Sequence, residues 1–141
     1  MPRQQTSRTR EEPEYRLLVT PHTVERTQQP STLVVLETTK VFASFRYELS
    51  VDARVTPSSL HFTVLGFRTP NLSLPAAGPA RFQHEYERLN GTIDVSIQGI
   101  DGRSTSFSLR ITPGQVKLLK APRKTFVQIA TSLSQWNSQG T

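Results

Sequence analysis

Residues 81–112 read RFQHEYERLNGTIDVSIQGIDGRSTSFSLRIT, and this stretch decides the fold class. Short runs of β-branched and aromatic residues alternate in it with polar residues, and the runs are separated by Asn-Gly and Asp-Gly. Alternation with a period of two residues is typical of strands with one buried face. The stretch therefore predicts a meander of three antiparallel strands.

The first turn of this meander is predicted at Asn90-Gly91, the preferred two-residue pair of a type I′ hairpin. This register sets Tyr86 opposite Val95, so that mostly apolar positions share one face. His84 falls on the same face and is expected to be a core histidine with its polar atoms satisfied, rather than a ligand or a base.

The second turn is predicted as a three-residue loop, Ile100 to Gly102. A two-residue loop at Asp101-Gly102 would place polar residues opposite apolar ones. With Gly102 in a left-handed conformation as a G1 bulge, Val95 pairs with Phe107. The sequence therefore favours the bulged turn.

The same reasoning extended along the chain predicts an all-β domain, a single antiparallel sandwich or partly open barrel. Lys40–Val55 is too long for one straight strand and is expected to bend, and Leu60–Phe67 is expected to be a central strand covered on both faces. Residues 125–136 fit either a short C-terminal helix, which a capping box from Thr125 to Gln128 would start, or a further strand. The predicted strands are Tyr15–Thr20, Thr32–Glu37, Lys40–Val55, Leu60–Phe67, Arg81–Leu89, Thr92–Gln98, Arg103–Thr112 and Gln115–Lys120.

Length and composition predict one domain, residues 15–136, between a polar tail at 1–14 that is expected to be disordered and a second tail at 137–141. The chain has no cysteine, which excludes disulfides and thiolate metal sites, and its three histidines form no cluster at metal-ligand spacing. We expect neither a metal nor a cofactor. No stretch approaches the roughly 20 apolar residues of a membrane span, and a cytoplasmic protein is expected.

Charge is distributed unevenly along the chain. The first 101 residues hold as many basic as acidic side chains, whereas residues 102–141 hold six cations and no acid, which accounts for the whole net charge of +6. A segment of one sign attracts phosphates or acidic proteins. The candidate anion- or partner-binding residues are Arg103, Arg110, Lys117, Lys120, Arg123 and Lys124.

The connection from Arg68 to Ala80 is long and contains three prolines. Long loops inside compact domains are often functional, and stiff apolar ones lose little entropy when they dock. Arg68, Leu72 and Leu74 are therefore candidate partner contacts, and packing of the two leucines against the domain itself is the alternative.

Carboxylates are predicted on the outward face of the meander. The hairpin register sets Glu87 opposite Asp94, with Ser108 opposite Asp94 and Arg110 one diagonal away. An exposed network between Arg110 and the two acids is the expected arrangement. A hydrolase that uses Glu85, Glu87 or Asp94 would instead require a pocket at these residues.

Residues 94–99, DVSIQG, resemble the D-x-S-x-x-G half of the signature of PilZ domains, small β-barrels that bind cyclic dinucleotides. The resemblance covers six residues and implies binding through Asp94, Ser96 and Gly99. The other half of that signature, R-x-x-x-R, does not occur in the chain, and Arg81 or Arg88 would have to replace it.

Together these features predict a non-enzymatic binding or assembly module. Its expected partner is an acidic or phosphate-bearing macromolecule, such as an acidic protein or a larger protein complex, which docks on the C-terminal cations. The alternative is a β-barrel that binds nucleic acid or a cyclic dinucleotide, and the hydrolase is a third hypothesis.

Overall fold

The computed structural model describes residues 13–43, 47–69, 78–121 and 126–139. The chain within these ranges is mostly β with one short C-terminal helix, in agreement with the sequence. Four of the residues singled out above, Leu72, Leu74, Arg123 and Lys124, and the predicted cap Thr125 lie outside the described residues. The elements are β1 (Tyr15–Val24), β2 (Gln29–Phe42), β3 (Glu48–Thr56), β4 (Ser59–Arg68), β5 (Gly78–Tyr86), β6 (Gly91–Gln98), β7 (Ser104–Thr112), β8 (Gln115–Lys120), β9 (Val127–Ala130) and α2 (Leu133–Gln139).

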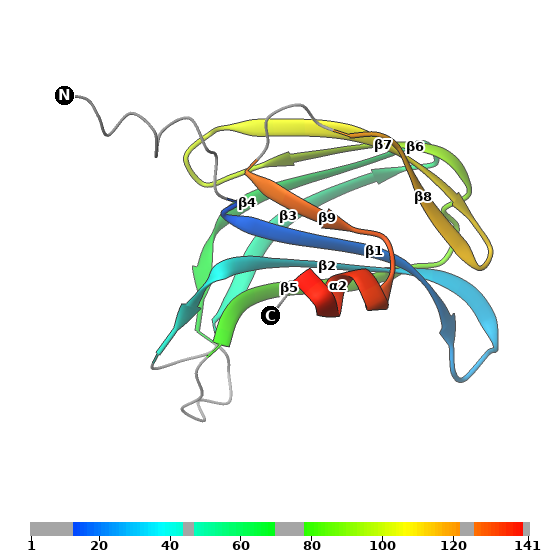
Figure 1. The fold of residues 1–141 in the computed structure, drawn as a ribbon, viewed down its shortest axis with the longest axis horizontal. Coiled ribbons are helices and arrows are strands. Elements are labelled where there is room, and N and C mark those ends of the chain that lie inside the picture. Colours follow the sequence, from blue (N-terminus) through cyan, green and yellow to red (C-terminus); the bar gives the residue numbers. More distant parts are fainter. Residues whose placement is uncertain (1–12, 44–46, 70–77, 122–125, 140–141) are drawn as a thin grey trace.

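The described strands belong to one sheet in the order β8-β7-β6-β4-β3-β5-β2-β1-β9. The sheet curls strongly, so that it forms a half-barrel rather than a sandwich of two separate sheets (Figure 1). It is also mixed and not purely antiparallel, because β4 pairs with β6, β1 with β9 and β3 with β5 in parallel.

The main core fills the concave side of the half-barrel. Alternate residues of the strands point into it, and its largest fully buried side chains include Phe62, Leu17 and Ile97. A smaller apolar cluster lies on the convex side beneath α2, where Trp136 packs with Leu18. The helix therefore covers only the part of the outer face formed by β1, β2 and β9 (Figure 1).

The predicted turn between β6 and β7 is confirmed with its register. Val95 pairs with Phe107, and Gly102 has the positive φ of 89° that a G1 bulge requires. The Gly99 N–H donates to the Arg103 carbonyl at 2.8 Å and closes the loop. The prediction succeeded because β6 and β7 pair with each other, and a loop of three residues then permits very few registers.

The predicted hairpin at Asn90-Gly91 is wrong. β5 pairs with β2, where His84 faces Val34, and β6 pairs with β4, where Val95 faces Leu60. Gly91 has a positive φ of 94°, as its sequence context suggests, but it starts β6 after a short link and does not close a hairpin. The extended ladders with distant strands outweigh the preference of one dipeptide.

The two long apolar stretches also differ in part from expectation. Lys40–Val55 does not form one strand, because β2 ends at Phe42 and β3 begins at Glu48. β4 is central, between β3 and β6, as predicted. Its outer face is not covered, however, since His61 and Leu65 are exposed, Leu65 to 62%.

The C-terminal segment contains both a strand and a helix. Residues 127–130 form β9, so a helix that begins near Thr125 is wrong, and α2 begins at Leu133. The cap is Ser132, whose Oγ accepts the Gln135 N–H at 3.1 Å, while the Gln135 Oε1 accepts the Thr131 N–H at 3.0 Å. The capping pattern is therefore present, seven residues later than predicted.

Candidate functional site

Three of the six predicted cations lie together on the outward face of β7 and β8. Arg110 pairs directly with Lys117, and Lys120 pairs with Ser108 on the same side of the sheet. The neighbours Val116 and Ile111 point inward to the core, which turns all three cations to the solvent. We call Arg110, Lys117 and Lys120 the basic strip.

The basic strip carries uncompensated charge. Within the described residues no ion pair involves Arg110, Lys117 or Lys120. Like charges directly opposite each other in a sheet repel, and a bound anion relieves this repulsion. The nearest acid along the ladder is Asp94, which accepts a hydrogen bond from the Ser108 hydroxyl at 3.0 Å and, contrary to the expected network, makes no ion pair with Arg110.

Arg103 does not belong to the basic strip, because its charge is compensated by its own acidic partners. Its guanidinium contacts Asp101 at 2.7 Å and Glu14 at 2.5 Å, and it lies 4.9 Å from the centre of the Phe126 ring. Hydrogen bonds from the backbone and side chain of Arg103 lower the pKa of Asp101 below its usual 3.8. Arg103 thus fastens the β6–β7 turn to the start of β1.

Of the three candidate partner contacts in the loop, only Arg68 is among the described residues. It contacts Glu48 on the neighbouring strand β3 at 2.7 Å, so part of its charge is already neutralised at the edge of the loop. The position of Leu72 and Leu74 stays a prediction.

The histidine and carboxylate predictions that relied on the Asn90-Gly91 hairpin are wrong. His84 shares a face with Tyr86, with the two rings 4.5 Å apart, but it is exposed and not a core residue. Glu87 follows the end of β5, and the ladder neighbours of Asp94 are Ser59 and Ser108. The facing pair of acids therefore does not form.

The residues implied by the PilZ resemblance are also not assembled. Asp94 and Ser96 lie on β6, whereas Arg81 lies on β5, and β4 and β3 separate these two strands. Among the described residues, no hydrogen bond or ion pair links Arg81 or Arg88 to Asp94. Within the part of the chain that the structure describes, the short motif has no arginine partner.

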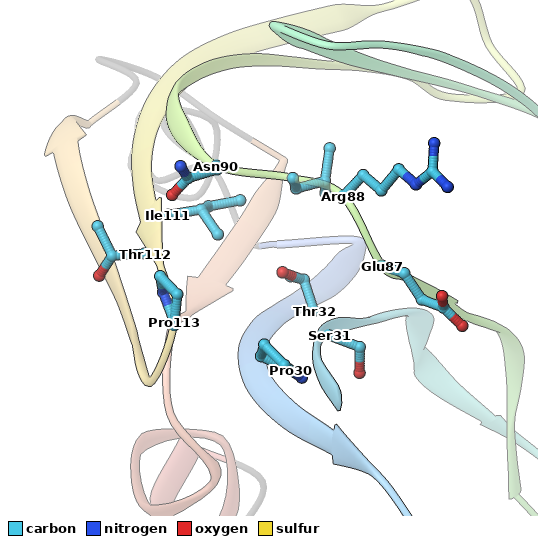
Figure 2. Close-up of a pocket in the computed structure, with 10 residues that line it drawn as sticks. Pro30, Ser31, Thr32, Glu87, Arg88, Asn90, Ile111, Thr112 and Pro113 are labelled. Carbon is cyan, nitrogen blue, oxygen red and sulfur yellow. The ribbon is translucent and has the colours of Figure 1, made fainter. Parts of the chain in front are cut away.

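A depression of about 240 Å³ opens at one end of the half-barrel, between β2, the β5–β6 link and the β7–β8 turn. Figure 2 shows the side chains of Glu87 and Arg88 extending away from Ile111 and Pro113 on the opposite wall. The Ser31 hydroxyl on its floor bonds to the His22 carbonyl and to Glu85 at 3.3 and 3.2 Å. The charged groups at this opening thus do not converge on one point.

His61 and Ser96 form a hydrogen bond across β4 and β6 on the exposed outer face. A serine nucleophile also needs a group that orients the histidine and donors that stabilise an oxyanion. Among the described residues, no ion pair or hydrogen bond links an acid to His61. We therefore assign this pair no catalytic role.

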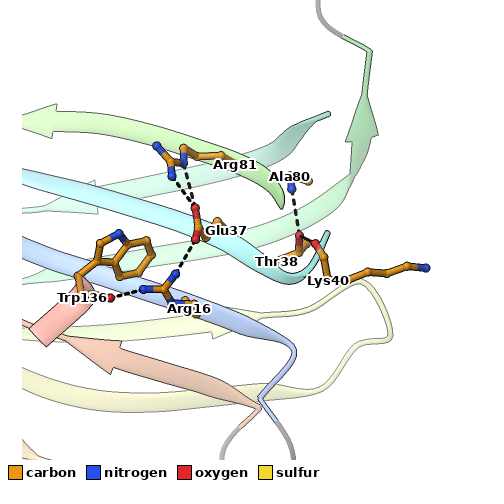
Figure 3. Close-up of polar contacts among 7 residues, drawn as sticks. All are labelled: Arg16, Glu37, Thr38, Lys40, Ala80, Arg81 and Trp136. Atoms are coloured by element: carbon orange, nitrogen blue, oxygen red, sulfur yellow. Dashed lines mark hydrogen bonds and ion pairs between the residues drawn. The ribbon is translucent and has the colours of Figure 1, made fainter. Parts of the chain in front are cut away.

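A buried ionic cluster joins β1, β2, β5 and α2, and the sequence did not predict it. Glu37, whose side chain is 4% exposed, contacts Arg16 at 2.9 Å and Arg81 at 2.8 Å (Figure 3). The Arg16 guanidinium lies 3.6 Å from the centre of the Trp136 ring and donates to the Trp136 carbonyl at 2.5 Å. This cluster, at the base of a depression of about 380 Å³, anchors the helix.

No family model, curated protein or solved structure matches this chain. Within the described residues, no group of three or more potential ligands is placed to hold a metal ion. The short helix α2 cannot cross a membrane, and no other helix of the described chain is long and apolar enough to do so.

Proposed function

We propose that this protein is a binding or assembly module that docks an acidic protein segment on the basic strip of β7 and β8. The observation that carries the proposal is the direct pairing of Arg110 with Lys117, beside Lys120, without an acid partner among the described residues. Adjacent unpaired cations on a rigid ladder form a preorganised site for carboxylates.

An acidic protein is favoured over nucleic acid because of what surrounds the strip. Its ladder partners outside the strip are Thr92 and Ser108, which can form hydrogen bonds but cannot stack on bases. Recognition of single-stranded nucleic acid relies on exposed aromatic platforms, and Phe107 on β7 points into the core.

Charge reversal tests the proposal. The double variant Lys117→Glu/Lys120→Glu should lose at least about tenfold in affinity for a fluorescent poly-glutamate peptide, because attraction becomes repulsion at two contacts. Arg26→Glu/Lys40→Glu is the matched control, since it makes the same change in charge at exposed cations outside the strip. Equal losses in both double variants would refute a localised site.

Comparing the acidic peptide with a DNA duplex separates the two partner classes, and a salt series measures the contribution of phosphate contacts. With about three phosphate contacts, binding to a DNA duplex should fall by roughly 100-fold between about 50 and 300 mM salt. Tight, strip-dependent binding of an oligonucleotide, with none of the acidic peptide, would replace this proposal by the nucleic-acid alternative. If neither probe binds, the lysines of β8 serve only to protect a sheet edge from pairing.

A further inference from the structure

The sheet is open between β3 and β5. The two strands are joined by one ladder pair, Glu48 with Arg81, supported by a hydrogen bond from the Arg81 N–H to the Tyr47 carbonyl at 3.3 Å. Beyond this pair β3 continues to Thr56 and β5 to Tyr86 without further pairing between them. Figure 1 shows the strands starting together and then diverging. We call this opening the β3–β5 slot.

Backbone groups of both strands face the slot without a ladder partner among the described strands. Successive residues of a strand direct their N–H and C=O groups to opposite sides. Because the Arg81 N–H points to β3, the backbone groups of Gln83 and Glu85 also point to this side, and the intervening residues bond to β2. By the same alternation from Tyr47, Val51 and Ala53 of β3 direct their groups toward the slot.

Side chains on the concave side of the slot are apolar and only half covered. Phe82 and Tyr86 of β5 and Val51 and Ala53 of β3 pack on the edge of the main core yet stay partly accessible. His84, between the two aromatic residues, is exposed although its parity directs it inward. The core is thus incomplete along the line where one more strand would lie.

Outward-facing side chains beside the slot favour a basic occupant. Glu85 is 3.5 Å from the His22 ring and makes no ion pair with a described Arg or Lys. Glu87, just beyond β5, has no ion pair with a described residue, and Asp52 on β3 is matched by Arg54 at 3.4 Å. The acids are therefore in excess, and a cation at an outward position of an added strand would be attracted to them.

We propose that the β3–β5 slot binds an extended segment of a partner protein as an added strand. The segment has apolar residues at alternate positions, which enter the half-covered core beside Phe82 and Tyr86, and Lys or Arg at the positions between them. Backbone pairing supplies affinity and the alternate side chains supply specificity, as in other cases of β-strand addition. This site is separate from the basic strip.

A synthetic peptide of about seven alternating Lys and Val residues tests the slot, with hydrogen exchange followed by NMR on the full-length chain. Binding should slow amide exchange of Gln83, Glu85, Val51 and Ala53 by at least about tenfold. A control peptide with the same side chains but methylated backbone nitrogens on alternate residues should bind at least about tenfold more weakly, because it cannot complete the ladder.

Variants at one position separate backbone pairing from side-chain effects. Gln83→Pro removes an N–H that faces the slot and leaves the ladder with β2 intact. It should therefore lower the affinity for the peptide by about tenfold. Gln83→Ala is the matched control and should bind like the wild type. If the proline variant fails to fold, the peptide with methylated backbone nitrogens remains the test of backbone pairing, and Ala53→Lys tests separately whether an inward charge blocks the slot.

Several outcomes would overturn the proposal. These are no saturable binding up to about 1 mM, equal binding of the methylated peptide, or protection confined to the edge of β8. A dimer of the protein that forms through the slot and is lost in Gln83→Pro would make the occupant a second copy instead. The variant Lys117→Glu/Lys120→Glu should retain peptide binding, so failure at the basic strip is distinguishable from failure here.

Discussion

Replacing Arg16 by methionine tests whether the buried ionic cluster holds the C-terminal helix in place. The substitution keeps a long apolar side chain but removes one of the two guanidinium groups that contact Glu37, together with the cation above the Trp136 ring. Breaking a buried ion pair costs about 3–5 kcal/mol because a charge is left without compensation. Arg81, whose side chain is 47% exposed, still contacts the other carboxylate oxygen of Glu37. We therefore expect about half of the cost of breaking a buried ion pair, near 2 kcal/mol.

The contact with the helix adds to this cost. The cation–π contact and the hydrogen bond to the Trp136 carbonyl together contribute about 1 kcal/mol. Arg16→Met should therefore lower the free energy of unfolding by about 3 kcal/mol. In the double variant Arg16→Met/Glu37→Met no buried acid is left unpaired, and its loss should be smaller than the sum of the two single losses by about 1–3 kcal/mol.

Urea unfolding followed by circular dichroism and by tryptophan fluorescence measures these effects. Trp136 is the only tryptophan of the chain, so its emission reports directly on α2. The control is Arg26→Met in the exposed β1–β2 turn, which should stay within about 0.5 kcal/mol of the wild type. A loss below about 0.5 kcal/mol for Arg16→Met, or strict additivity in the double variant, would refute the reasoning.

Two further predictions concern single residues. Gly102→Ala should lower the free energy of unfolding by about 1 kcal/mol in urea unfolding, because the φ angle of Gly102 is 89°. No atom lies within 4 Å of the added methyl group, so backbone strain accounts for the whole cost. An unchanged midpoint would contradict a left-handed Gly102. Burial raises the pKa of Tyr15 above its usual 10.0. The contribution of the neutral Tyr15 side chain to stability is therefore fully present below about pH 10, and it is lost as the pH rises through the pKa of the folded state. Tyr15→Phe should therefore flatten the alkaline decline of the unfolding free energy, and a decline that is as steep as in the wild type would argue against this assignment.

The sequence by itself determined what depends on neighbours along the chain. The period of two residues predicted the strands, and the parity of side chains around Gly102 predicted the register in which Val95 meets Phe107. It also located a segment without acids, which contains Arg110 and Lys117. These features are local, because a short loop restricts the pairing of its two strands to very few registers.

Only the tertiary structure decided what depends on distant segments. Asn90-Gly91 favours a hairpin locally, yet β5 and β6 each bond along their length to other strands, and those ladders outweigh one turn. His84 has the inward parity that the sequence predicts but is exposed, since coverage depends on whether a strand lies opposite it. A side chain's face follows from local alternation, whereas its burial follows from the whole sheet.

The candidate sites divide in the same way. The sequence identified the basic segment. Only the structure shows that Arg103 is paired with Glu14, whereas Arg110 and Lys117 lie opposite each other on β7 and β8. Arg16 and Glu37 are 21 residues apart, and no sequence period connects them. Strand pairing brings such residues together, because Arg16 is the ladder partner of Glu37 and Glu37 is the ladder partner of Arg81 on neighbouring strands.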